Sequence, residues 1–411
     1  MSFLSRLRDT AASLLDRTIF SQPTSVTTAE NTSCETLSTR STVPRLREVE
    51  ECSSRKVHRL SNCVSLAMMT AAEAASSGIT FATTPCRFFD VGRQSAFMPD
   101  PCGLVPISLN HVHWFSSFMS FTSSEGNEHH IVLCTGTDRQ TITMCCLLVG
   151  SFMIVHENRC ADEVADAVGP IAHLFLPFSD CSCCDPFHVE DCWQALHLSK
   201  NLGWIDTTVS KGSVEALHME DHQHCPPSSP ERWSGIYVLV PSKLIVFDCP
   251  NTLPEEAETA RADQPCNRDP SYYAACLADY NVDLVVRCCE DNVYDEGAFI
   301  ERGVVVENIN MNDRRLELLF QRVDRFLTLA RAVPKIAIHG DRSGLACAHV
   351  LISVLLIRYY GFDALAAKAW ACMVRPDCAV SDSERLRFVD SLREPGLAPQ
   401  MVHSTRSRCE K

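Results

Sequence analysis

The chain has 411 residues, of which 45% are hydrophobic, and a formal net charge of −14. The length favours more than one domain, and the hydrophobic content excludes general disorder. An acidic chain is a poor nucleic-acid binder, because neutralising phosphates takes clustered Lys and Arg, but it suits basic partners. With no recognisable secretory signal, the 23 cysteines are interpreted as reduced thiols in a cytoplasmic or nuclear protein.

Residues 1–80 are predicted to be an amphipathic start followed by a disordered region rich in Ser and Thr. Residues 1–20 place their apolar side chains on one helical face, and a packed helix, a partner-docking helix and a transit-like segment all fit this pattern. Residues 21–56 have little apolar periodicity, which is typical of disorder. We therefore expect no folded domain before residue 81.

The first α/β domain is predicted over residues 81–206. An apolar strand at 131–134 leads into a short polar loop and then into an apolar helix that ends at Val155. A second helix is predicted at 161–168, and a linker helix between the two domains is predicted at 188–206. A polar loop at 207–231, which contains three prolines, is interpreted as the domain boundary.

The second domain is predicted over residues 232–395, with a tail at 396–411. It repeats the order of the first: a strand at 335–339, a loop around 341–344, an apolar helix to Tyr360 and a helix at 363–370. This repetition, about 200 residues apart, predicts two related α/β domains in tandem, each a central sheet flanked by helices. No apolar run reaches the ~20 residues that a bilayer requires, so no membrane span is expected.

A strand that feeds a tight loop and a buried helix is suited to binding an anion. The N–H groups of the loop and of the helix N-terminus converge on one point, where the helix dipole favours negative charge. Phosphate hydrolysis at such a loop requires a cysteine thiolate as nucleophile, an arginine that clamps the phosphate and a separate aspartate that protonates the leaving group.

The residues of the second repeat resemble a known phosphatase family. The matching positions are the pairs 338–339, 344–345, 351–352, 369–370 and 375–376, together with Tyr360. Upstream matches are Thr135, Asp138, Gly150 and residues 131–132, 176–180, 241–244 and 281–287. The order and spacing of these residues, over roughly 90–390, resemble the dual-specificity protein phosphatases of the cell-division-cycle "fourteen" (mitotic-exit) type. The resemblance implies two tandem phosphatase-like domains, of which only the second is catalytic.

The second loop departs from the family pattern at both essential positions. An alignment through Tyr360 and Trp370 places Asp341 at the cysteine and Cys347 at the arginine. An alignment through His339 instead places Gly340 at the cysteine. Neither alignment places a cysteine at the nucleophile position or an arginine at the phosphate-clamping position. What remains of the phosphate loop is then His339, Arg342, Ser343 and Gly344.

Two aspartates keep alternative roles. Asp313 lies near the position of the family's general acid, and it is either a remnant of that acid or an ordinary turn residue. Asp341 is a built-in anion that accepts the loop N–H bonds, a solvated side chain, or a carboxylate nucleophile. The first loop is expected to be inactive, because the interval from Cys134 to Arg139 is one residue short of the phosphatase spacing.

No metal site and no cofactor are predicted. Two clusters contain ligand-type residues, but neither has the second ligand pair of a structural zinc site; they are His218, His222, His224 and Cys225, and Cys181, Cys183 and Cys184. The sequence thus predicts a pseudophosphatase that binds phosphoproteins or basic peptide segments. An active phosphatase with altered loop chemistry and a purely structural partner are the alternatives.

Overall fold

The computed structural model describes eleven segments of the chain, which are residues 57–61, 63–77, 86–91, 107–124, 130–178, 186–205, 235–250, 269–289, 294–309, 316–340 and 345–375. Contacts divide the chain into two compact units. The first comprises residues 1–93 and 120–138, and the second comprises residues 94–119 and 139–411. The predicted boundary at 207–231 does not separate these two units.

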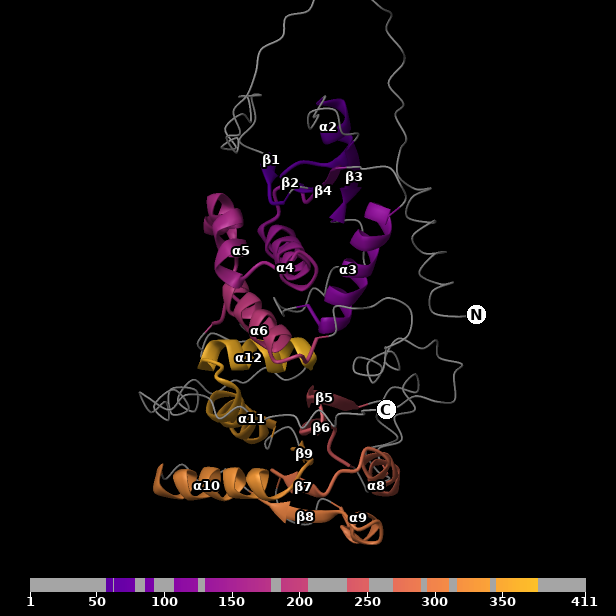
Figure 1. Cartoon of the computed structure of the whole chain (residues 1–411), viewed down its shortest axis with the longest axis vertical. Coiled ribbons are helices and arrows are strands. Elements are labelled where there is room, and N and C mark those ends of the chain that lie inside the picture. Colours follow the sequence, from indigo (N-terminus) through magenta and orange to yellow (C-terminus); the bar gives the residue numbers. More distant parts are fainter. Residues whose placement is uncertain are drawn as a thin grey trace, which may run out of the picture. The chain divides into compact units, whose positions relative to one another are not determined.

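The first unit contains a four-stranded sheet in the order β1-β2-β4-β3 (Figure 1). Its strands are β1 (Val57–Arg59), β2 (Val64–Ala67), β3 (Cys86–Asp90) and β4 (His130–Cys134). β2 and β3 are parallel to β4, whereas β1 is antiparallel to β2. Every residue of β2 and β4 is buried, as expected of central strands.

The prediction that residues 1–80 lie outside the folded part is wrong for residues 57–77. This stretch supplies β1, the buried strand β2 and helix α2 (Ala71–Ser76), whose N-terminus is held by a capping box of Thr70 and Glu73. Ser65 interrupts the apolar pattern of β2, but its hydroxyl lies 2.9 Å from His130 Nε2 and is thereby satisfied inside the sheet. Residues 1–56 lie outside the described residues.

A group of helices opens the second unit. They are α3 (Leu109–Ser124), of which residues 109–119 belong to this unit, α4 (Arg139–Val155), α5 (Ala161–Val168), the 3-10 helix η2 (Gly169–Leu174) and α6 (Val189–Asn201). The predicted helices to Val155 and at 161–168 are confirmed. The helix predicted to reach Asp206 is wrong at its C-terminal end, because α6 stops at Asn201 and Gly203 takes a left-handed φ of 74°.

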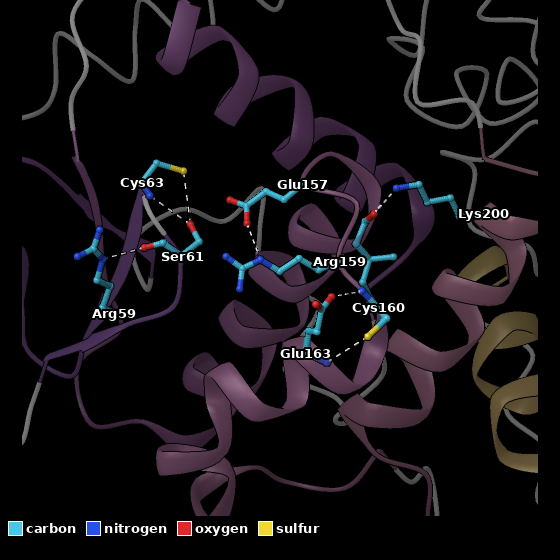
Figure 2. Close-up of polar contacts among 9 residues, drawn as sticks. Arg59, Ser61, Cys63, Glu157, Arg159, Cys160, Glu163 and Lys200 are labelled. Carbon is cyan, nitrogen blue, oxygen red and sulfur yellow. Dashed lines mark hydrogen bonds and ion pairs between the residues drawn. The ribbon is translucent and has the colours of Figure 1, made fainter. Parts of the chain in front are cut away.

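Helices α4 and α6 pack closely at Gly150. A Cβ atom at this position would lie 2.3 Å from Trp193 Nε1, so only glycine leaves room for the indole ring. The C-terminus of α4 is capped by Lys200 of α6, which Figure 2 labels; its Nζ donates to the carbonyl oxygens of Ile154 and Val155. Figure 2 also shows the capping box of α5, in which Glu163 accepts from the N–H of Cys160.

The second unit also contains a five-stranded sheet in the order β5-β6-β9-β7-β8. Its strands are β5 (Ile236–Val240), β6 (Leu244–Phe247), β7 (Leu284–Arg287), β8 (Val305–Asn308) and β9 (Ile336–His339). β6, β9, β7 and β8 are mutually parallel, and β5 pairs antiparallel with β6. The predicted strand at 335–339 is confirmed.

Helices cover both faces of this second sheet (Figure 1). On one face, α8 (Pro270–Asp279) and α9 (Gly297–Ile300) pack Tyr273, Leu277 and Phe299 against the sheet. On the other lie α10 (Leu316–Ala332), α11 (Leu345–Tyr360) and α12 (Ala364–Val374). Trp370 of α12 donates its indole N–H to the Leu239 carbonyl of β5, 2.9 Å away. The predicted helices to Tyr360 and at 363–370 are confirmed, and Asp363 caps the second of them.

Helix α6, predicted as a linker, is part of the second unit's core. It lies beside α12 (Figure 1), and the Trp204 ring that follows it contacts Tyr360, Phe362 and Trp370 at centroid distances of 4.9 to 5.7 Å. Among the described residues, no single helix is long and apolar enough to cross a membrane. The bent pair of Ala348–Tyr360 and Ala364–Val374 passes that test jointly, and nearly all of its residues are buried.

Candidate functional site

Polar and titratable side chains gather at the carboxyl edge of the second sheet. β6 is followed by Asp248 and Cys249, and β7 ends at Arg287 and is followed by Cys288 and Cys289. β9 ends at His339. Because these strands are parallel, their carboxyl ends meet at one edge, which is where ligands bind in open α/β sheets.

His339 is fully buried and held in a fixed orientation. Its Nε2 lies 2.8 Å from the hydroxyl oxygen of Tyr294, and its ring packs 4.7 Å from that of Phe247. Its Nδ1 is buried without a hydrogen-bond partner among the described residues. Burial lowers the pKa of His339 to about 3, and the positive charges of Arg287 and Arg375 add to this shift. The imidazole is therefore neutral at pH 7.

Arg287 is the buried cation of this edge. Its guanidinium forms an ion pair with Glu296, donates to Asn308 Oδ1 and lies 5.2 Å from the centre of the Tyr294 ring. The residue is only 3% exposed. These contacts bind β7 to β8 and α9, so Arg287 serves the structure of the edge.

Arg375, which ends α12, makes a second buried ion pair at the same sheet. Its Nη2 lies 2.7 Å from Asp248 Oδ1, and its guanidinium stacks 5.1 Å from the Tyr237 ring. Asp248 fits because Gly235 carries no side chain: a Cβ there would lie 2.4 Å from Asp248 Oδ2, and the glycine φ is 87°. The arginine matched to the family's Arg-Pro pair therefore anchors α12 to the sheet.

The segment predicted to be a phosphate-loop remnant, residues 339–344, lies only partly within the described residues. Gly340 follows His339 directly and is buried, and α11 begins at Leu345. Asp341, Arg342, Ser343 and Gly344 lie outside the described residues, as does Asp313. Cys347 lies in the first turn of α11, and its side chain is not described. Between the strand and the helix the sequence contains no cysteine.

The first loop has a cysteine, but this thiol is buried. Cys134 is the last residue of β4 and has no exposed surface. Burial, with the charge of Asp90 as a smaller cause, raises the pKa of Cys134 to about 12. The side chain therefore stays a thiol at neutral pH, whereas nucleophilic attack requires a thiolate.

The arginine of the first loop is also engaged in structure. Arg139 begins α4, and its guanidinium donates to the carbonyl oxygens of His173, Leu174 and Phe175 over 2.8 to 3.3 Å. It thereby fixes the end of η2 to the start of α4. These bonds occupy Nε and Nη2, so only Nη1 is left and the two-nitrogen fork that clamps a phosphate is not available.

Sequence reasoning missed one group of side chains. Cys249, Cys289 and His339 each offer a metal-ligand atom, and these three atoms all lie within 4.8 Å of one another. The residues lie far apart in the sequence, so no ligand spacing reveals them. Their common signal is position, since each stands at or just after the end of a parallel strand. The two Cys/His clusters considered from the sequence lie outside the described residues.

Comparison with known proteins relates this chain to phosphatases. Residues 86–199 match the family model "Dual specificity protein phosphatase, N-terminal half". The chain is 20% identical over 260 residues to dual specificity protein phosphatase CDC14B of Mus musculus and 21% identical to CDC14C of Symphalangus syndactylus. Each match covers 62% of this chain, and the chain spans about half the length of these curated relatives.

Solved structures give matches of the same kind. A putative protein tyrosine phosphatase from Leishmania major matches with 21% identity and a TM-score of 0.28, covering 37% of this chain and 88% of that one. The active form of Tk-PTP matches with 18% identity and a TM-score of 0.30, covering 39% of this chain and 99% of that one. The family match over residues 86–199 and the similarity to CDC14B and CDC14C together support a relationship of this chain to the CDC14-like dual-specificity protein phosphatases.

Proposed function

We propose that the chain is a pseudophosphatase, a protein with a dual-specificity phosphatase fold that binds phosphoproteins or basic peptide segments without hydrolysing phosphate. One observation carries this proposal. From the end of β9 to the start of α11 the sequence reads His-Gly-Asp-Arg-Ser-Gly-Leu, residues 339–345, and it contains no cysteine. A thiolate nucleophile is therefore absent where this chemistry requires one.

The engaged arginines add support. Arg287 and Arg375 are buried and paired with Glu296 and Asp248, so both guanidinium groups already have anionic partners. In phosphatases a clamping arginine stabilises the charge of the transition state, and loss of such a group typically costs a few kcal/mol. Arg342 follows Asp341 in the loop and lies three positions earlier than the start of the helix, too early for the family's arginine.

The charge of the chain favours basic partners. A net charge of −14 attracts Lys- and Arg-rich segments, and complementary charge mainly raises association rate and specificity. Asp341 at the loop would repel phosphate and favour the basic segment over the phosphate group. A role in cell-division control and a cytoplasmic or nuclear location are part of this proposal, and similarity to the CDC14 proteins supports them.

The decisive experiment is turnover of a small aryl phosphate by the purified chain, beside the double variant Asp341→Cys, Cys347→Arg. We expect no hydrolysis above buffer for the wild-type chain, because no thiolate is present. Turnover by the double variant alone would show that the scaffold is intact and only the chemistry is missing. Wild-type turnover that disappears in Asp341→Asn would overturn the proposal in favour of a carboxylate nucleophile.

Binding is tested with a basic phosphopeptide and its unphosphorylated form, by calorimetry at two salt concentrations. We expect similar affinity for both forms and weaker binding at higher salt, because exposed charges are screened within roughly 10 Å at 0.1 M. Asp341→Asn should improve phosphopeptide binding by removing like charge. If Asp341→Asn unfolds the domain instead, Asp341 is the internal anion of the loop and the phosphate-binding part is wrong.

A further inference from the structure

Three ligand-type side chains converge at the carboxyl edge of the second sheet, and the proposed pseudophosphatase function does not use them. Cys249 follows β6, Cys289 follows β7 and His339 ends β9, the strand that lies between those two. One ligand atom from each lies within 4.8 Å of the other two. We propose that Cys249, Cys289 and His339 form a zinc-binding site.

The hydrogen bonding of His339 is that of a metal ligand. Its Nε2 faces the Tyr294 hydroxyl at 2.8 Å, while its Nδ1 is buried with no hydrogen-bond partner among the described residues. A ligating histidine typically donates its other ring N–H to an oxygen, which fixes the ring and the tautomer. In the proposed site, the tautomer protonated on Nε2 donates to the Tyr294 hydroxyl, and Nδ1 is the nitrogen that binds the metal. A buried imidazole nitrogen without a partner otherwise costs free energy.

The distances suit a zinc ion after small side-chain movements. Zinc lies about 2.3 Å from sulfur and about 2.0–2.1 Å from nitrogen, which places tetrahedral ligand atoms roughly 3.5–3.8 Å apart. The three atoms within 4.8 Å of one another would have to close by about 1 Å. Thiolate and imidazole ligands together select zinc over magnesium or calcium, which prefer oxygen. The fourth position is left for water or an exogenous ligand on the side of Cys249, the half-buried member of the set.

The charges around the site balance. Two thiolates neutralise the charge of Zn²⁺, so the buried centre carries no net charge and avoids the cost of burying an ion. The neighbouring cations, Arg287 and Arg375, have their own anions in Glu296 and Asp248. A disulfide between Cys249 and Cys289 is the competing use of these thiols. It would leave His339 Nδ1 without a partner, whereas the metal gives this nitrogen one.

The experiment measures zinc by mass spectrometry in the full-length chain, purified without chelator, and in Cys249→Ser and Cys289→Ser. Cys288→Ser is the matched control, because Cys288 is equally buried and adjacent but lies outside the ligand group. We expect both ligand variants to bind one equivalent less than wild type, and the control to bind the wild-type amount. The proposal is tested by the difference in zinc content between wild type and each ligand variant. Zinc bound elsewhere on the chain is present in all four proteins and does not change that difference. Equal zinc content in all four proteins overturns the proposal.

A second measurement uses the unmodified chain, in case a variant fails to fold. We expect added zinc to protect Cys249 from alkylation and a chelator to restore its reactivity, read out by peptide mass spectrometry. Cobalt added to the apoprotein should give a thiolate charge-transfer band that zinc abolishes. Alkylation of Cys249 that zinc leaves unchanged, or a Cys249–Cys289 disulfide in protein purified under reducing conditions, overturns the proposal.

Discussion

The strand-loop-helix segment of β4 and α4 and that of β9 and α11 share a backbone pattern but use their polar residues differently. In the first, the strand ends in Cys134, a buried thiol whose pKa is raised to about 12, and Arg139 donates to backbone carbonyls. In the second, the strand ends in His339, which lies among Tyr294, Arg287 and two further cysteines.

This difference shows that one backbone pattern can engage its polar residues in structural contacts in two different ways. The first loop keeps a cysteine and an arginine in nearly the right order, but burial and backbone hydrogen bonds occupy both. The second loop lacks the cysteine altogether, and the titratable groups of its sheet edge bond to one another. The residue types in a loop therefore say little about its chemistry until the burial and the contacts of each side chain are known.

The prediction with the largest expected effect concerns which N-terminal residues the first sheet needs in order to fold. Deleting residues 21–56 should leave the melting temperature within about 2 °C of the full chain, because their composition is typical of disorder. Deleting residues 1–77 should abolish cooperative unfolding of the first unit, because β2 is fully buried and pairs with both β1 and β4. Calorimetry of both deletions checks this. Equal melting of the two would mean that β1 and β2 contribute nothing to the fold.

The second prediction concerns the buried cation of the second sheet edge. Arg287→Met should destabilise the chain by about 3 kcal/mol, because it leaves Glu296 without its buried partner. The matched control is Arg325→Met, which removes an ion pair to Glu307 from a side chain that is 57% exposed and should cost less than about 1 kcal/mol. Urea unfolding gives both values. Equal costs would show that Arg287 is not a structural residue.

Part of this organisation could be predicted from the sequence. The strands and helices flanking both loops follow from long apolar runs, and β4, α4, α5, β9, α11 and α12 lie where periodicity places them. β1 and β2 were missed because they are short and because Ser65 breaks the apolar run; its partner His130 is 65 residues away. The ligand group at Cys249, Cys289 and His339 depends on strand order, which spacing along the chain does not reveal.

The third prediction returns to the helix of the first segment. Gly150→Ala should destabilise the chain by about 1–3 kcal/mol, because the new methyl group would overlap the Trp193 indole ring. Gly169→Ala is the control, since a Cβ there meets no atom within 4 Å, and its effect should stay within about 0.5 kcal/mol. Denaturant unfolding measures both. A neutral Gly150→Ala would mean that α4 and α6 separate easily.

The smallest predicted effect uses His349, a buried residue of α11 that lies outside the proposed zinc ligands. Both of its ring nitrogens lack a hydrogen-bond partner among the described residues, and burial lowers its pKa to about 3. The unfolded chain therefore binds this proton first as the pH falls below ~6.5. The stability that the folded chain gains from keeping His349 neutral is complete above that pH. It is lost as the pH falls towards 3, and the free energy of unfolding drops by at most about 1.4 kcal/mol per pH unit.

His349→Leu should remove the loss of stability at low pH. It should also remove the free-energy cost of burying two ring nitrogens without hydrogen-bond partners. We expect the variant to be about 1 kcal/mol more stable than wild type at pH 7, with a margin that widens at pH 5. His173→Leu, at an exposed position of η2, is the control for the substitution itself and is measured in the same way. Urea unfolding at the two pH values measures the margin. A margin that stays constant with pH would show that His349 is protonated in the folded chain, and would mean that the helix of the second loop is less tightly buried than that of the first.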